Sequence, residues 1–322
     1  MAPILDFHCH VFPAPLESLI SPGWRRQTRS WLQPYTRTVH SLQTLMRLLP
    51  ETARKGLDEL GSLVSLPGML VASSPADLQE SMADNRVDYS LVIAHPPIAS
   101  NEFVLDASHA YKNLIPVVNI PVGAPKPAAR LKSYVKKGAK ALKIHAAADG
   151  EGVDSPRYKA LLRTASDLAI PVILHTGCIY NHIYYRDPEQ GHAERFAKWF
   201  TAYPNTQFIL AHMNFHSPAV AMDLMEDHPN VYTDTSWQPA EVIGEAVRRL
   251  GSERILFGTD WPFVGNNLSV GLGRVRKCVD AGTLTETDAQ RILGDNALKL
   301  LGMLDATGTG KNLGSATESA ET

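Results

Sequence analysis

The residues best suited to chemistry in this sequence are two histidines that stand two positions apart near its start. His8 and His10 belong to the segment DFHCH at 6–10, which follows the apolar residues Ile4 and Leu5. Side chains alternate faces along a β-strand, so both imidazoles point to the same side of an extended segment. Two such imidazoles form half of a metal site, although an isolated pair is as often two ordinary surface or core histidines.

Eight short apolar runs predict buried parallel strands, because β-branched and aliphatic runs of this kind are typical of strands covered on both faces. Stretches with apolar residues at helical spacing lie between them, for example Ser155–Leu168 and Pro239–Leu250. The predicted strands are Ile4–His10, Val87–His95, Leu114–Pro121, Lys140–Ala146, Ile170–Thr176, Thr206–Met213, Asn230–Ser236 and Arg254–Asp260. Eight such units predict an α/β fold, the (β/α)8 TIM barrel.

The carboxyl ends of these predicted strands are rich in metal-ligating residue types. Strand ends of a (β/α)8 barrel converge on one mouth, which carries the active site. His8, His10, His175, His212 and Asp260 can therefore meet in space despite their separation in the sequence. Imidazole and carboxylate ligands suit Zn²⁺ and, less selectively, Mn²⁺, Fe²⁺ or Co²⁺. We therefore predict one bound divalent cation, with zinc as the first choice and manganese as an alternative.

Several motifs resemble the amidohydrolase superfamily, specifically its amidohydrolase-related branch (amidohydrolase 2), which includes α-amino-β-carboxymuconate-ε-semialdehyde decarboxylase and many metal-dependent hydrolases. The resemblance runs in order from the N-terminus to about Leu304, with a weakly matching stretch from Pro13 to about Ala83. The motifs are DFHCH at 6–10, PVILHTG at 171–177, FILAHMN at 208–214, NVYTDTSW at 230–237, ILFGTDWPF at 255–263 and ILGDNALKLLG at 292–302.

The resemblance implies a role for each residue of the site. His8, His10, His175 and Asp260 would bind one divalent metal, and His212 would be the acid/base residue beside the metal-bound water. General chemistry agrees, because a neutral imidazole titrates near working pH. Asp260 is a second catalytic candidate, since a carboxylate can both ligate and accept a proton. A role for His212 as a metal ligand or as a bystander stays open.

Lys143 and His145 stand two positions apart in the fourth predicted strand, so both should face the barrel interior. Binuclear members of the superfamily place a carbamylated lysine or a carboxylate near this strand end, so a second metal is one interpretation. A single metal is the usual pattern in the branch that this chain resembles. We therefore predict that Lys143 and His145 bind substrate, and we add Trp261 as a further candidate.

A long insertion follows the first predicted strand, from Val11 to about Met82. An insertion at this place emerges at the barrel mouth, so residues 11–82 should cap the site and shape its specificity. A guanidinium matches a carboxylate in a bidentate fork. Candidates for holding a substrate carboxylate are Arg25, Arg26, Arg29 and Arg37. For any single arginine a solvated surface position is the alternative.

Length and composition bound the remaining possibilities. The 322 residues exceed the roughly 250 of a bare barrel, which predicts one domain over 1–304 and a disordered tail over 305–322. The formal net charge of −2 without a basic run provides no footprint for nucleic acid, and no apolar stretch approaches the ~18 residues of a membrane span. Cys9, Cys178 and Cys278 form no disulfide framework, which favours the cytoplasm.

Three functions compete at the level of the sequence. The favoured one is a metal-dependent hydrolase that acts on the carbonyl of a lactone, amide or ester. The alternative is a non-oxidative decarboxylase, a carboxy-lyase for a carboxylated aromatic or muconate-like acid. A non-catalytic metal-binding sensor would require the loss of a ligand or of His212, and none is missing. The expected partner is a small-molecule substrate, carboxylated in the second interpretation, and a homodimer is the assembly that we consider.

Overall fold

Eight parallel strands form one sheet in the order β1 to β8, the order of the chain. The structure is a computed structural model that describes residues 2–13, 21–50, 52–59, 72–180, 182, 184–265 and 267–304. The strands are β1 (Leu5–Cys9), β2 (Tyr89–Ile93), β3 (Leu114–Asn119), β4 (Ala141–Ile144), β5 (Val172–Leu174), β6 (Phe208–Leu210), β7 (Val231–Asp234) and β8 (Ile255–Leu256).

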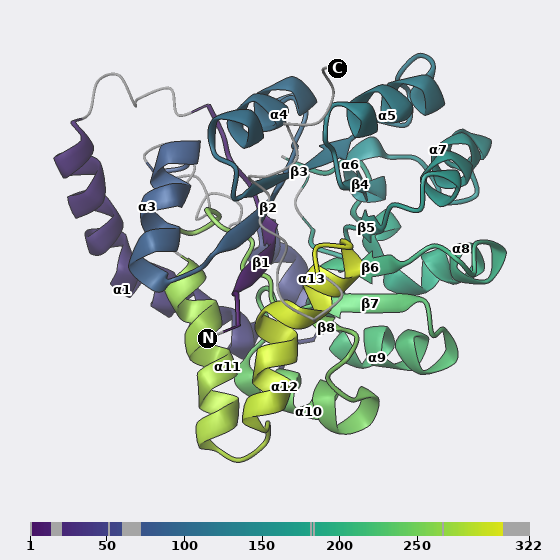
Figure 1. The fold of residues 1–322 in the computed structure, drawn as a ribbon. Coiled ribbons are helices and arrows are strands. Elements are labelled where there is room, and N and C mark those ends of the chain that lie inside the picture. Colours follow the sequence, from purple (N-terminus) through teal and green to yellow (C-terminus); the bar gives the residue numbers. More distant parts are fainter. Residues whose placement is uncertain are drawn as a thin grey trace.

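Helices surround the sheet on its outer side (Figure 1). They are α1 (Pro22–Met46), α3 (Pro75–Asn85), α4 (Asn101–Ala110), α5 (Pro127–Lys136), α6 (Ala146–Asp149), α7 (Pro156–Asp167), α8 (Ala197–Ala202), α9 (Pro218–Asp227), α10 (Ala240–Leu250), α11 (Asn267–Asp280), α12 (Glu286–Gln290) and α13 (Asn296–Leu300). Shorter turns are η2 (Pro188–Gly191), η3 (Ala193–Phe196), η4 (Ala211–Asn214) and η5 (Arg291–Asp295), and residues 52–59 are also helical.

Backbone hydrogen bonds between the first and last strands close the sheet into a barrel. The amide of Phe7 donates to the carbonyl of Phe257 at 2.7 Å, and the amide of Asp260 donates to the carbonyl of His8 at 2.7 Å. The amide of His10 donates to the carbonyl of Trp261 at 2.6 Å. This closure confirms the predicted TIM barrel and places the loop after β8 directly beside the end of β1.

All eight predicted strands are present, but each is shorter at its carboxyl end than expected. The sequence predicted a strand over Thr206–Met213, whereas β6 ends at Leu210 and His212 lies in the η4 turn. The backbone of His212 is left-handed, with φ at 60°. An apolar run marks the buried part of a strand, whereas the residues just beyond it are shaped by the site that they form.

The first strand contains an irregularity that the strict alternation of side chains did not predict. The pairing of β1 with β2 shifts register between Asp6 and Cys9. Phe7 packs in a buried cluster with Leu91 and Ile93 of β2, while His8 lines the cavity of the site. A bulge re-aims the side chains that follow it, so His8 and His10 both reach the barrel mouth.

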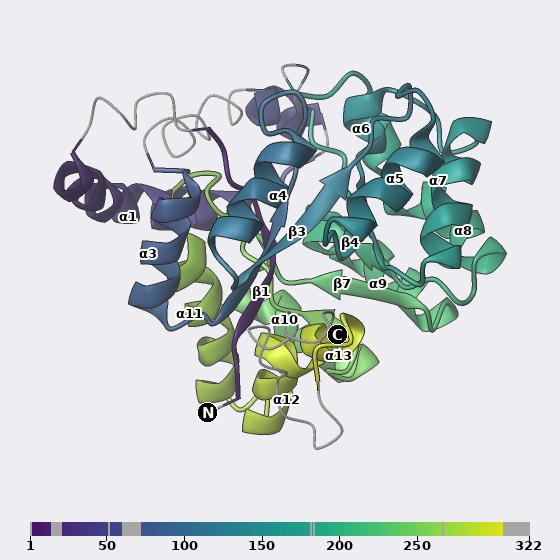
Figure 2. The same ribbon diagram turned by 45° about the horizontal axis from the view of Figure 1, so that its top comes forward.

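The segment predicted to cap the barrel contributes α1, which lies beside α3 and α11 in both views (Figure 2). The hydroxyl of Thr36 donates to the carbonyl of Val264 at 2.6 Å, and the His40 ring stacks on Trp237 with 4.5 Å between ring centroids. These contacts join α1 to the loops after β7 and β8. The tail over 305–322 and parts of the segment 11–82 lie outside the described residues, and the domain boundaries stay predictions.

No helix in the described part of the chain combines the length and the apolar character that crossing a membrane requires.

Candidate metal centre

Three ligand-type side chains meet at the junction of β1 with the loop after β8. The Nε2 atom of His10 lies 3.3 Å from Oδ1 of Asp260, and Nε2 of His8 lies 3.6 Å from the same oxygen. The ligand atoms of the three residues all lie within 4.8 Å of one another, and all three residues are buried. Two imidazoles and a carboxylate at this spacing suit a divalent cation such as zinc.

Hydrogen bonds fix which nitrogen of each histidine faces the others. Nδ1 of His8 donates to Oδ2 of Asp234 at 2.8 Å, and Nδ1 of His10 donates to the carbonyl of Ile93 at 3.0 Å. Each ring then carries its lone pair on Nε2, the atom that faces Asp260. Nε2 of His8 has no hydrogen-bond partner within the described part of the chain. The residues present therefore fit a bound cation.

His175 brings a third imidazole to the same region from the residue after β5. It is buried, and its Nε2 also has no hydrogen-bond partner among the described residues. Its ring centroid lies 5.2 Å from that of His212 and 3.9 Å from that of His145. His175 is not part of the group of three whose ligand atoms lie within 4.8 Å of one another.

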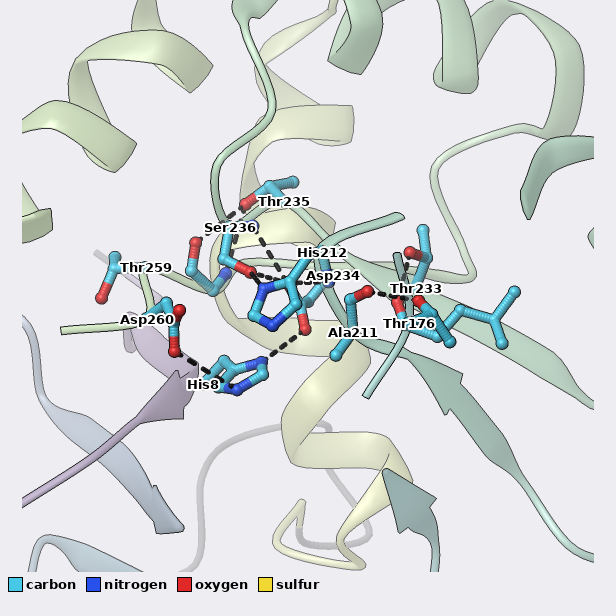
Figure 3. A network of polar contacts seen from close by, with 12 residues as sticks. His8, Thr176, Ala211, His212, Thr233, Asp234, Thr235, Ser236, Thr259 and Asp260 are labelled. Carbon is cyan, nitrogen blue, oxygen red and sulfur yellow. Dashed lines mark hydrogen bonds and ion pairs between the residues drawn. The ribbon is translucent and has the colours of Figure 1, made fainter. Parts of the chain in front are cut away.

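A network of polar contacts centred on Asp234 links His8 to His212 (Figure 3). The backbone amide of His212 donates to Oδ1 of Asp234 at 3.2 Å, and the hydroxyl of Ser236 donates to the same oxygen. The single hydroxyl hydrogen of Ser236 is thus used, so Nδ1 of His212, 2.7 Å away, donates to the Ser236 oxygen. Nε2 of His212 is left with the lone pair and can accept a proton.

The electrostatics of this region keep the carboxylates charged and the imidazole neutral. Burial opposes the charge of Asp260, but the nearby His212, His10 and His8 outweigh it and hold its pKa well below the usual range. Burial lowers the pKa of His212 to about 3, so the ring is neutral at pH 7. Burial also lowers the pKa of Lys143 to about 8, against the attraction of Asp260 and Asp234.

His212, Trp237 and Asp260 have a left-handed backbone that side-chain-bearing residues rarely adopt. The φ angles are 60° at His212, 63° at Trp237 and 59° at Asp260. Each residue follows the end of a different strand, β6, β7 or β8. Such conformations persist where the surrounding structure enforces them, and they cluster at functional sites.

A cavity of about 370 Å³ opens onto these residues. One end is polar and holds His8, His10, His95, Lys143, His145, His175, His212 and Asp260. Most of the other lining residues are apolar or aromatic, namely Val39, Leu42, Met46, Leu57, Ile179, Tyr184, Tyr185, Phe215, Trp237, Phe263 and Val264. Among the described lining residues, Lys143 is the one lysine or arginine. The cavity therefore fits an apolar molecule with a polar reacting end.

Of the predicted substrate-binding residues whose side chains the structure describes, Lys143 and His145 line the cavity, whereas Arg25, Arg26 and Trp261 do not. Trp261 is fully buried in a cluster with Cys9 and does not line the cavity. Its predicted contact with substrate is not supported by this position.

The arginines of α1 whose side chains the structure describes do not line the cavity. The guanidinium of Arg25 is buried 3.8 Å from Asp77, and the exposed Arg26 lies 3.7 Å from Asp84. Arg37 is exposed, and the side chain of Arg29 lies outside the described part of the structure. The helix instead turns Val39, Leu42 and Met46 toward the cavity, so Arg25, Arg26 and Arg37 face away from it.

Sequence reasoning missed two residues that hold the site together, Asp234 and Trp237. Nε1 of Trp237 donates to Oδ2 of Asp260 at 2.7 Å, and Asp234 holds His8. Both belong to the motif NVYTDTSW, which was identified as a family resemblance without a role for either residue. The position of Asp234 near the carboxyl end of a predicted strand, two residues before Ser236, was the available signal.

The family model described as Amidohydrolase matches residues 5–303. The chain belongs to the amidohydrolase family. No curated protein matches the sequence.

Solved structures of low identity share the fold. An uncharacterised TIM-barrel protein, Bb4693 from Bordetella bronchiseptica, is 20% identical with a TM-score of 0.65, covering 93% of this chain and 98% of that one. The 5-carboxyvanillate decarboxylase LigW from Sphingomonas paucimobilis is 15% identical, with a TM-score of 0.62 and coverage of 94% and 99%. An amidohydrolase from Burkholderia multivorans with bound zinc is 12% identical, with a TM-score of 0.62 and coverage of 94% and 99%.

Other similar structures are a probable 2-pyrone-4,6-dicarboxylic acid hydrolase and a 4-oxalomesaconate hydratase. Similarity therefore leaves the reaction open among hydrolysis, decarboxylation and hydration.

Proposed function

We propose that this protein is a metal-dependent hydrolase for an ester, lactone or amide of an apolar small molecule. The observation that carries the proposal is the composition of the cavity. Its polar end combines ligand-type residues with a proton-accepting His212, and its remaining lining residues are mainly apolar, with no arginine among those described. A substrate with a neutral carbonyl group and an apolar body matches both ends.

The ligand set that we propose is His8, His10, His175 and Asp260, with zinc as the metal and manganese as an alternative. The free Nε2 atoms of His8 and His175 and the short approach of His10 to Asp260 support this set. When bound, such a cation supplies Lewis-acid polarisation of the substrate carbonyl and lowers the pKa of water.

His212 is the proposed general base and acid. Its Nε2 takes the proton from the attacking water, and the Ser236 hydroxyl holds the opposite nitrogen so that the ring does not turn. The same Nε2 then returns the proton to the oxygen or nitrogen of the leaving group. Trp237 orients Asp260 through its Nε1 hydrogen bond and keeps that carboxylate directed at the site.

Decarboxylation is the second candidate, and Lys143 is the observation in its favour. Its buried Nζ has no hydrogen-bond partner within the described residues, and an ammonium there can attract a substrate carboxylate. Two similar structures are decarboxylases by their printed names, for 5-carboxyvanillate and for 2,6-dihydroxybenzoate.

A panel of substrates separates the two reactions. Dihydrocoumarin, phenyl acetate and acetanilide test lactone, ester and amide hydrolysis, while 5-carboxyvanillate and 2,6-dihydroxybenzoate test CO₂ release. We expect hydrolysis of at least one of the first three without CO₂ release from the acids. The His212→Asn variant, purified identically, controls for a contaminating esterase. Release of CO₂ with no hydrolysis would replace the proposal by the second candidate.

A further inference from the structure

His145 differs from the other histidines of the site in the nitrogen that it uses within the protein. The backbone amide of Ala148 donates to Nδ1 of His145 at 3.2 Å, where α6 begins. A nitrogen that accepts a hydrogen bond carries no hydrogen, so the ring is neutral and its hydrogen is on Nε2. The rings of His8, His10 and His212 have the opposite arrangement, with Nδ1 as donor.

This arrangement excludes His145 from metal binding although it stacks on a proposed ligand. Its ring lies 3.9 Å from that of His175 with an angle of 14° between the planes. A metal ligand must offer a lone pair, and the lone pair of His145 is on Nδ1, which the amide of Ala148 occupies. Nε2 offers a hydrogen instead.

The ring of His145 borders the cavity, within reach of a molecule that enters it. His145 lines the polar end of the cavity and is 5% exposed, next to Tyr185 at 5.0 Å between ring centroids. Lys143 precedes it by two residues on the same strand face, and its buried ammonium adds positive potential to the region. β4 and the residue that follows it thus contribute two donors and no ligand.

We propose that His145 donates its Nε2 hydrogen to the substrate oxygen that becomes negative during hydrolysis. The inference rests on the proposed hydrolase function. Water oxygen bonds to the carbonyl carbon while the π pair moves to the carbonyl oxygen, which becomes an oxyanion. The pair then re-forms the double bond, and the leaving group departs with the proton that His212 carries. A neutral donor fixed in advance stabilises the oxyanion without losing its own proton.

Two substitutions at His145 separate this role from a structural one. Asparagine is a good helix-capping residue, so His145→Asn keeps a side-chain acceptor for the backbone amide of Ala148. The side-chain amide hydrogens of the asparagine fall short of the position that Nε2 occupies in His145. His145→Gln carries an N–H closer to that position. We expect His145→Asn to lower kcat about 10²- to 10³-fold with unchanged metal content, and His145→Gln to recover part of the loss. An unchanged kcat in His145→Asn, or loss of metal, would overturn the proposal.

Nitrogen-15 NMR of histidine-labelled protein tests the tautomer without any substrate. Long-range proton–nitrogen spectra distinguish a ring protonated on Nε2 from one protonated on Nδ1. The signals absent from His145→Asn should belong to the Nε2 form, and those absent from His212→Asn to the Nδ1 form. An Nδ1 form for His145 would overturn the inference even if hydrolysis is found. Conversely, CO₂ release alone from the substrate panel would overturn the function and the oxyanion role while leaving the tautomer result intact.

Discussion

Asp234 connects His8, a proposed metal ligand, with His212, the proposed general base, through hydrogen bonds. It accepts from Nδ1 of His8 and from the hydroxyl of Ser236, which in turn accepts from His212. Burial opposes its charge, but His8 and His212 outweigh this effect and lower its pKa to about 2. Asp234 therefore stays ionised at neutral pH and sets the tautomer of two histidines at once.

Replacing His212 tests the proton transfer. We expect His212→Asn to keep the metal and to lose about 10²- to 10⁴-fold in kcat, the range for removing a general acid or base. Metal analysis and steady-state kinetics on the same sample check this. Joint loss of metal and activity would make His212 a ligand, and an unchanged kcat would remove it from the mechanism.

Replacing Asp234 tests the support of His8. Asp234→Asn should weaken metal affinity about 10- to 100-fold, because the amide no longer holds the Nδ1 hydrogen of His8 as a charged acceptor. Competition against a chromophoric chelator measures this. Ser236→Ala is the matched comparison, since Ser236 donates to the other oxygen of Asp234, Oδ1, and its loss leaves the Oδ2 contact with His8 in place, so its metal affinity should fall much less. Equal affinity in both variants would contradict the role of Asp234.

Among the elements, α1 contributes three residues to the apolar lining of the cavity. Val39, Leu42 and Met46 of this helix line the cavity, while Arg25 and Arg26 lie near carboxylates of α3. The prediction that the inserted segment shapes the site is consistent with this placement, but its arginines are not the residues that do so. An insertion can be located from the sequence, whereas the rotation of its helix depends on what the helix packs against.

Truncating Met46 tests the role of α1 in substrate binding. Met46→Ala should raise KM for an apolar substrate about 5- to 30-fold with little change in kcat, because about 1–2 kcal/mol of apolar contact is lost equally in ground and transition states. Leu45→Ala is the control, since Leu45 is 59% exposed and does not line the cavity. A large fall in kcat for Met46→Ala, or equal effects in both variants, would count against this assignment.

The attachment of α1 should depend on pH through His40. Burial and the nearby Arg274 lower the pKa of His40 to about 3 from its ordinary 6.5, and they outweigh Asn267 and Asp260, which raise it. The folded state thus favours the neutral ring. Its contribution to stability is complete above pH 6.5 and is lost as the pH falls from 6.5 toward 3.

Thermal unfolding of the parent and of His40→Gln at several pH values checks this. The parent should be the more stable at pH 7, and the difference in Tm should shrink by pH 4.5, because glutamine does not titrate. Parallel Tm curves for the two proteins would show that His40 is not the titrating group.

Across these elements, the sequence was sufficient for the strands and for much of the site. Continuous apolar runs predicted every strand, since burial on both faces leaves a clear pattern. His8, His10, His175, His212 and Asp260 were found because strand ends converge in a barrel. Asp234, Trp237 and the tautomer of His145 could not be assigned, because they depend on hydrogen bonds between segments distant in the sequence.

At the scale of the whole molecule, the site exists only because the barrel closes. Asp260 follows the last strand and His8 lies on the first, and backbone hydrogen bonds between these segments join them. Near the amino end of β1, the chain packs closely against η5, where a Cβ on Gly294 would lie 1.9 Å from the carbonyl oxygen of Pro3. The family match over residues 5–303 covers both sides of this closure.

Assembly of two copies of the chain into a homodimer stays a prediction.

The most direct test of the account is the metal content of protein purified without chelators, measured by elemental analysis together with activity. We expect close to one equivalent of a divalent metal per chain, chiefly zinc, with clearly lower content in His10→Ala and Asp260→Ala. Removing the metal exhaustively should abolish activity, and adding zinc should restore it. Full activity in metal-free protein, or unchanged metal content in both variants, would contradict the central claim that these strand ends form a catalytic metal centre.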